Sequence, residues 1–346
     1  MKRKSIKRRV QSDASCDDVN MCAQIRGVKF NSDGSCFAFV DENGFRVFNS
    51  DPIKEICHVE MDGRIQIVEP IFRSGLIALV GDGSSTALPM EKVCIYDCHR
   101  YTITVQLNVR SAVRNLSCQQ NRIVVATQQY IYVYTLADIP ECLFYFETHY
   151  NPFGLFAVFG SQTFIAFPAH ACGFVGITFD STTTTDKIIR AHRHNLQTIS
   201  ISPNGYLLAT ASVKGTLVRL FDLPTMSLIS EFRRGNNPAY ISCITFSDDS
   251  SFLCVGSDRP TLHVFCTKKQ KDSQNKSFLK RYFPSRENDL RLYRRSSNGA
   301  QLTSTQIAIY HENIIAIDSN GNYSRFEVDL DRSTISNSTH RDISVI

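Results

Sequence analysis

The chain has 346 residues, of which 42% are apolar and 21% are charged, so a folded core is expected and wholesale disorder is excluded. It has no run of about 18 apolar residues, and no apolar stretch follows the basic start MKRKSIKRR, so neither a membrane-spanning helix nor a signal peptide is expected. The net charge of +5 is concentrated in residues 1–10 and 268–295, which leaves a mildly acidic remainder. This distribution argues against a uniformly basic nucleic-acid binder.

One pattern recurs along the chain: an alternating strand, a polar turn, a more apolar strand, a second turn and a third strand. Its copies begin, in chain order, at Gly27, near 65, at Val113, near 154, at Thr198, at Cys243 and near Thr305. Successive copies lie about 43 residues apart, except that roughly 20 extra residues precede the last one. Seven units of four-strand size predict an all-β protein, a seven-bladed β-propeller.

The units resemble WD repeats in a degenerate form. The chain contains no tryptophan, and Tyr96-Asp97 and Phe221-Asp222 stand where the Trp-Asp pair would be. This departure does not affect the expected blade geometry. The predicted division of the chain is a basic disordered tail at 1–20, a single propeller at 21–330 and a disordered tail at 331–346.

Motifs for catalysis or metal binding are missing from the sequence. The 12 cysteines are scattered without a C-x-x-C pair, which favours buried free thiols in a reducing compartment. No H-E-x-x-H, G-x-S-x-G or phosphate-loop motif occurs. His192 and His194 share one side of a strand, but the sequence suggests no third ligand. We expect no enzyme activity, no metal and no cofactor.

The most distinctive segment is Phe232-Arg233-Arg234-Gly235, which follows the third strand of the fifth unit. It is expected on the outer strand of that blade, where consecutive side chains point in opposite directions. The two arginines therefore cannot serve one pocket, but they can serve two neighbouring pockets. Guanidinium groups bind phosphate oxygens through paired hydrogen bonds, and Gly235 leaves room at the backbone. The alternative is an ordinary exposed arginine pair on an edge strand.

Further motifs accompany this segment. They are Ala191-His192, the ATAS-x-KGT-x-x-R run at 209–219, SFLCVGSDRPTLHVF at 251–265 and, more weakly, KVCIYD at 92–97, NRIVVATQQYIYVY at 121–134 and AFP at 166–168. With these flanks the chain resembles the PROPPIN family, the WD-repeat propellers that bind phosphoinositides in autophagy. The likeness covers roughly residues 25–330 and is greatest to the short-chain branch.

The resemblance implies two headgroup sites beside blades five and six. The first would use His192, Ser212, Thr216, Arg219 and Arg233. The second would use Arg234, Ser257, Arg259, Thr261 and His263. Arginine supplies charge, the hydroxyls donate hydrogen bonds, and histidine donates better when protonated. Binding is therefore expected to strengthen as the pH falls from about 7.5 toward 6. The family usually has lysine and glycine at Arg259 and Pro260, and the proline stiffens the turn and removes an N–H group. Each hydroxyl taken alone could equally belong to a turn.

The resemblance also implies a membrane-insertion loop in blade six, at about 268–290. Its apolar side chains are Phe278, Leu279, Tyr282 and Phe283, and basic residues surround them. Charge would attract anionic lipid while the apolar tip enters the interface. A solvated loop is the plain alternative, and nucleic-acid binding is a weaker one because no recognition fold accompanies the residues.

The sequence thus predicts a propeller that binds phosphatidylinositol 3-phosphate, together with the 3,5-bisphosphate, and recruits autophagy machinery to forming autophagosomal membranes. The resemblance implies one protein partner, the large rod-shaped lipid-transfer protein of autophagy. A monomer is expected, cytoplasmic and peripheral on phagophore, autophagosomal or endosomal membranes, without nucleic acid. The rival from another class is a generic WD-repeat scaffold that docks proteins and binds no lipid.

Overall fold

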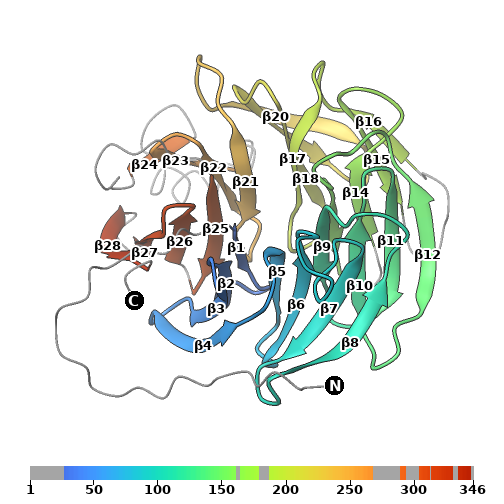
Figure 1. The fold of residues 1–346 in the computed structure, drawn as a ribbon. Helices are drawn as coiled ribbons and strands as arrows, with labels where there is room; N and C mark the ends of the chain where they lie inside the picture. The colour runs from blue at the N-terminus through green and yellow to red at the C-terminus, as the bar shows by residue number, and fades with distance from the viewer. Residues whose placement is uncertain are drawn as a thin grey trace, which may run out of the picture.

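The computed structural model describes residues 27–160, 164–178, 187–267, 289–293, 304–311, 313–329 and 334–343. Every regular element in these ranges is a β-strand. Accordingly, these ranges contain no helix with the length and apolarity needed to cross a bilayer. The strands form seven four-stranded sheets arranged as the blades of a propeller (Figure 1).

In each blade the four strands pair antiparallel, in chain order. Blade one contains β1 (Gly27–Phe30), β2 (Cys36–Val40), β3 (Gly44–Asn49) and β4 (Lys54–Glu60). Blade two contains β5 (Ile65–Ile71), β6 (Leu76–Gly81), β7 (Lys92–Asp97) and β8 (Thr102–Asn108). Blade three contains β9 (Asn115–Cys118), β10 (Arg122–Ala126), β11 (Tyr130–Thr135) and β12 (Cys142–Glu147). Blade four contains β13 (Ala157–Phe159), β14 (Phe164–Pro168), β15 (Phe174–Thr178) and β16 (Lys187–Arg190). Blade five contains β17 (Leu196–Ile201), β18 (Leu207–Ser212), β19 (Leu217–Asp222) and β20 (Ser227–Arg233). Blade six contains β21 (Ile241–Phe246), β22 (Phe252–Ser257), β23 (Thr261–Cys266) and β24 (Asp289–Tyr293). Blade seven contains β25 (Thr305–Tyr310), β26 (Asn313–Asp318), β27 (Asn322–Asp329) and β28 (Thr334–Asp342).

The prediction of a seven-bladed all-β propeller is confirmed, and each predicted unit contains the first three strands of one blade. The degenerate WD positions fall at the ends of third strands. Asp97 accepts hydrogen bonds from the backbone N–H groups of His99 and Arg100, and Asp222 accepts one from Thr225. The aspartate therefore orders the turn into the fourth strand even where the tryptophan is missing.

The hydrophobic core lies between the blades. Seven buried clusters each join two neighbouring blades, including the pair formed by blades seven and one. The second and third strands are buried on both faces, whereas fourth strands such as β8 expose alternate residues. This explains why the middle strands are almost continuously apolar and the outer strands are not.

Blade seven closes the ring against blade one. The rings of Phe37 and Phe39 share a buried cluster with Ile315 and Tyr323. The Tyr323 hydroxyl donates a 2.8 Å hydrogen bond to the carbonyl of Ser50. Because Ser50 and Tyr323 are far apart in the chain, these contacts fix the two ends of the propeller together.

The expectation of a disordered tail at 331–346 is wrong for residues 334–342, which form strand β28 paired with β27. Next to it, Ile343 is completely buried. The sequence of β28, TISNSTHRD, is polar because a fourth strand needs a backbone partner on one side only. Composition alone therefore cannot distinguish this strand from a tail. Residues 1–20, predicted as the other tail, lie outside the described residues.

The extra residues before the seventh unit lie within blade six. Strand β23 ends at Cys266 and β24 begins at Asp289, so the connection between the third and fourth strands contains them. This is the position that the resemblance implies for the loop. Phe278, Leu279, Tyr282 and Phe283 all lie outside the described residues, and their role stays a prediction.

Candidate functional site

The Phe-Arg-Arg-Gly segment lies at the end of β20, the fourth strand of blade five. Phe232 is buried and stacks on Phe265 of blade six, with ring centroids 4.9 Å apart. Arg233 is exposed and Arg234 is buried, with 7% of its surface accessible. Strand alternation thus places the two arginines on opposite sides of β20. A Cβ atom at Gly235 would meet nothing within 4 Å, so the backbone there is open to solvent.

Arg233 lies on the side of blade five that faces blade four. Cross-strand pairing sets Leu217 opposite Arg233 and Arg219 opposite Glu231, so these side chains share one face. Arg219 forms a 2.8 Å ion pair with Glu231 and donates a 2.6 Å hydrogen bond to the carbonyl of Ala191. The sequence analysis missed Glu231, although its position two residues before Arg233 was a signal that both face the same way.

His192 is buried beside this group. Its Nε2 atom lies 3.0 Å from the hydroxyl of Thr210, another residue that the sequence analysis missed. Burial, with a smaller contribution from the Arg219 guanidinium, lowers the pKa of His192 to about 4. The ring is therefore neutral between pH 6 and 7.5 in the unliganded protein, so protonation of His192 in this range would accompany binding of an anion.

The two hydroxyl residues of the first predicted site flank the turn between β18 and β19. Ser212 and Thr216 are both buried, each with 6% of its surface accessible. Gly215 between them has a φ of +63°, and a Cβ there would lie 1.7 Å from the carbonyl oxygen of Ala239. Only glycine allows this close approach, which holds the turn against the connection from blade five to blade six.

Arg234 lies on the side of blade five that faces blade six. Its Nε atom donates a 2.9 Å hydrogen bond to the carbonyl of Gly215, and its Nη2 atom donates to the carbonyl of Asn237. Burial, and then the neighbouring Arg259, lower the pKa of Arg234. Two neighbouring cations repel each other, and an anion bound between them would relieve that repulsion.

The remaining residues of the second predicted site lie on β22, β23 and their turn. Ser257 and His263 are buried, and His263 stacks on Phe265 at 5.9 Å. Thr261 Oγ1 lies 3.4 Å from His263 Nε2. The side chain of Arg259 is about half exposed and donates a 3.3 Å hydrogen bond to the carbonyl of Pro238. The structure thus gathers Arg234, Arg259 and His263 at the junction of blades five and six.

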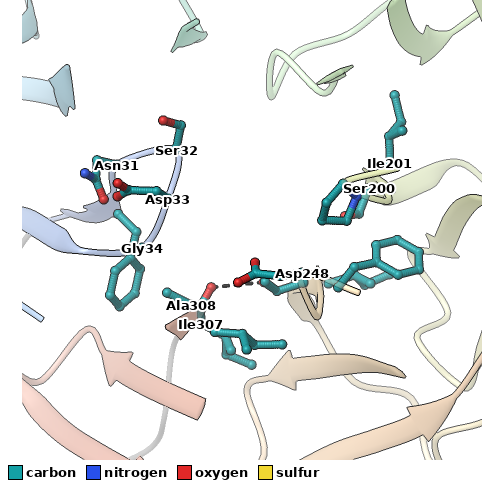
Figure 2. A pocket seen from close by; sticks show the side chains of 15 residues that line it. Asn31, Ser32, Asp33, Gly34, Ser200, Ile201, Asp248, Ile307 and Ala308 are labelled. Atoms are coloured by element: carbon teal, nitrogen blue, oxygen red, sulfur yellow. Dashed lines mark hydrogen bonds between the residues drawn. The ribbon is translucent and has the colours of Figure 1, made fainter. Parts of the chain in front are cut away.

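A cavity of about 200 Å³ opens elsewhere on the propeller. Figure 2 shows Asp33 and Asp248 around it, on the turns that follow the first strands of blades one and six. First strands run away from the end where β20 terminates, so this cavity lies at the opposite end of the blades from Arg233 and Arg234. Two carboxylates make it a poor site for an anionic headgroup.

In the part of the chain that the structure describes, no group of three or more histidine, cysteine or acidic side chains could hold a metal ion. Ten cysteines in that part are free thiols. The expectation that they are buried is wrong for Cys142 and Cys172, which are exposed.

The fold and the paired arginines define a class of protein, a seven-bladed propeller with two arginines on opposite sides of one outer strand. The family model described as PROPPIN matches residues 24–280. SVP1-like protein 2 of Pichia angusta is 34% identical over 244 residues, which cover 68% of this chain and 68% of that protein. Autophagy-related protein 18 of Dictyostelium discoideum is 34% identical over 240 residues, which cover 69% of this chain and 64% of that protein.

Solved structures show the same fold. Kluyveromyces lactis Hsv2 aligns with a TM-score of 0.73 and 23% identity, covering 93% of this chain and 99% of that one. The KlAtg21 chain in a complex with the coiled coil of AgAtg16 aligns with a TM-score of 0.76 and 20% identity, covering 92% and 99%. On the family match and the relatives, the chain belongs to the PROPPIN family of phosphoinositide-binding propellers.

Proposed function

We propose that this chain binds phosphatidylinositol 3-phosphate and phosphatidylinositol 3,5-bisphosphate, one headgroup on each side of β20, and acts by binding rather than by catalysis. The observation that carries the proposal is the position of Arg233 and Arg234 on opposite sides of one strand. Each arginine has a second cation on its own side, Arg219 or Arg259. The names of its relatives, among them Autophagy-related protein 18, support a role in autophagy.

In the first site, Arg233 is the group available to a phosphate. It is exposed and makes a 3.3 Å hydrogen bond to the amide of Asn236, which a phosphate oxygen can replace. Arg219 is held by Glu231 and the carbonyl of Ala191, so its guanidinium is fixed in position while the Glu231 carboxylate balances its charge. Ser212 and Thr216 would donate hydroxyl hydrogen bonds to the inositol ring.

In the second site, Arg234 is fixed in place before any ligand arrives. Its guanidinium donates to two carbonyl groups, and within the described residues no carboxylate forms an ion pair with it. Arg259 can swing toward a phosphate because half of its side chain is exposed. We propose that Thr261, His263 and Ser257 complete this site. Because Pro260 cannot donate a backbone hydrogen bond, the side chains carry more of the recognition here.

The loop at 268–290 would add an apolar contact to the headgroup contacts. It joins β23 to β24, and β23 carries Thr261 and His263 of the second site. Phosphate contacts at an exposed edge are screened by salt, whereas apolar insertion is not. We propose that the four apolar side chains of this loop supply that second contribution.

Attachment of the propeller to a membrane would allow it to recruit autophagy machinery there. We propose a monomer in the cytoplasm that binds peripherally to phagophore, autophagosomal or endosomal membranes. Its proposed protein partner is the large rod-shaped lipid-transfer protein of autophagy, bound on a surface away from both headgroup sites. The support for this part is the family and the autophagy names of the relatives.

Sedimentation with vesicles that each contain one phosphoinositide tests the proposal. The parent protein should sediment with the two named lipids, and the double variant Arg233→Ala/Arg234→Ala should lose roughly 100-fold or more in affinity, since each charged contact contributes about 1.5–3 kcal/mol. Arg100→Ala/Arg110→Ala removes the same charge from exposed positions in blade two and its exit, so it should bind like the parent. Equal binding by a folded double variant would contradict the assignment of the two sites to these arginines, whereas a parent protein that sediments with neither lipid would favour the scaffold that binds no lipid.

A further inference from the structure

Four connections meet at the end of blades five and six where β18 and β22 terminate. They adjoin both predicted headgroup sites, because Arg233 and Arg234 lead directly into one of them. Blades five and six are neighbours in the ring and share a buried cluster (Figure 1). We call the combined area the blade 5–6 loop surface, and it consists of residues 193–195, 213–215, 235–240 and 258–260.

The backbone of this surface is fixed by hydrogen bonds between the connections. The N–H group of Val213 donates to the carbonyl of Asn195 over 2.9 Å. The N–H group of Asp258 donates to the carbonyl of Tyr240 over 3.0 Å, and the N–H group of Tyr240 donates to the Asp258 carboxylate over 3.1 Å. The side chains of the surface are therefore presented from a rigid backbone rather than from a mobile loop.

Two large apolar side chains project from the blade 5–6 loop surface into solvent. Val213 is 49% exposed and Tyr240 is 45% exposed. Pro238 and Pro260 are exposed beside them. Side chains of this kind, an aliphatic tip and an amphipathic aromatic ring, are suited to the boundary between lipid headgroups and acyl chains.

The charge around these two side chains is positive. Arg193, Lys214, Arg233 and Arg259 are all exposed on or beside the surface. The sequence of the four connections contains one acidic residue, Asp258, which lies 3.9 Å from Arg259. An anionic partner is therefore favoured.

We propose that the blade 5–6 loop surface is a second membrane-contact element, in which Val213 and Tyr240 enter the interface of an anionic bilayer. This inference rests on the proposed function, because the same docking would bring Arg233 and Arg234 to their headgroups. A bilayer fits better than a protein because the two apolar side chains lie among exposed cations, and the surface continues into both headgroup sites. The contact is separate from the loop at 268–290, since its connections lie at the end where β22 terminates, whereas that loop leaves blade six where β23 ends, at the other end of the blade.

The absence of tryptophan from the chain makes a direct test available. Tyr240→Trp introduces a single indole, and so does Val213→Trp in a second variant. A matched control is Tyr206→Trp, because Tyr206 is 60% exposed in the turn at the opposite end of β18. Each variant is mixed with vesicles of phosphatidylcholine, phosphatidylserine and phosphatidylinositol 3-phosphate, with brominated lipid as the quencher, and sedimentation of the same samples measures binding.

The proposal expects blue-shifted, quenched emission from the indoles at positions 240 and 213 on bound protein and unchanged emission at position 206. It also expects Val213→Ser/Tyr240→Ser to lose about tenfold in vesicle affinity at high salt, with unchanged affinity for soluble inositol 1,3-bisphosphate, while Tyr206→Ser binds normally. Sedimenting protein whose indoles at 240 and 213 remain unquenched would overturn this inference and leave the proposed function intact. Failure of the parent to sediment with any phosphoinositide vesicle would overturn both.

Discussion

Replacing the two arginines of β20 one at a time should have unequal effects on stability. Arg234 is buried and donates to the carbonyls of Gly215 and Asn237, so it joins the turn of blade five to the connection toward blade six. Arg233 is exposed, with one 3.3 Å hydrogen bond to Asn236. Arg234→Ala should therefore destabilise the propeller, and Arg233→Ala should not.

The size of the effect at Arg234 follows from its two hydrogen bonds. Each bond to a charged group contributes about 1.5–3 kcal/mol when made, and the cost of burying the guanidinium offsets part of that sum. The same desolvation by burial lowers the pKa of Arg234. We expect Arg234→Ala to reduce the free energy of unfolding by about 2 kcal/mol. Arg233→Ala should change it by less than about 0.5 kcal/mol, as for most exposed positions.

Urea unfolding followed by circular dichroism measures both values. Arg234→Lys serves as a control that keeps the charge but cannot donate to both carbonyls as a fork, so its midpoint should lie between those of the parent and Arg234→Ala. Equal urea midpoints for Arg233→Ala and Arg234→Ala would contradict a stabilising role for the buried guanidinium. In that case the buried position of Arg234 would contribute nothing to the fold.

Three further predictions concern pH, ring closure and the loop. The pKa of His192 is lowered from 6.5 to about 4 on folding, so as the pH falls the unfolded chain takes up the proton first. The contribution of His192 to the free energy of unfolding is therefore complete above about pH 6.5, and about 2 kcal/mol of it is lost between pH 7 and 5. Thermal unfolding should show a smaller loss in His192→Asn. Tyr323→Phe removes the buried bond to Ser50 between blades seven and one, and it should lower the free energy of unfolding by about 1–2 kcal/mol in urea titrations. Serine at all four apolar positions of the loop at 268–290 should weaken vesicle binding at high salt and spare soluble headgroup binding; unchanged binding at high salt would make the loop a linker.

Repeat spacing was sufficient to predict the propeller. The middle strands are apolar because both of their faces are buried, and the turns between them are polar because they face solvent. This contrast recurs at intervals of about 43 residues and is visible in the sequence. The outer strand β28 was missed because one partner strand is enough to hold it, and its sequence carries no apolar pattern. The ring closure was also not predictable, because the contact between Tyr323 and Ser50 depends on the completed circle.

In the candidate site, too, local features were predictable from the sequence and contacts between strands were not. Strand alternation predicted that Arg233 and Arg234 point to opposite sides of β20, since that follows from local geometry alone. The sequence could not predict that Glu231 pairs with Arg219, because this requires the register between β19 and β20. Nor could it predict the lowered pKa of His192, which arises from burial between two blades.

Calorimetric titration with soluble inositol 1,3-bisphosphate counts the headgroup sites without a membrane. We expect two sites per chain in the parent, one in Arg233→Ala, one in Arg234→Ala and none in the double variant. Two sites in a folded double variant, or no binding by the parent, would contradict the claim that the arginines on the two sides of β20 form two headgroup sites.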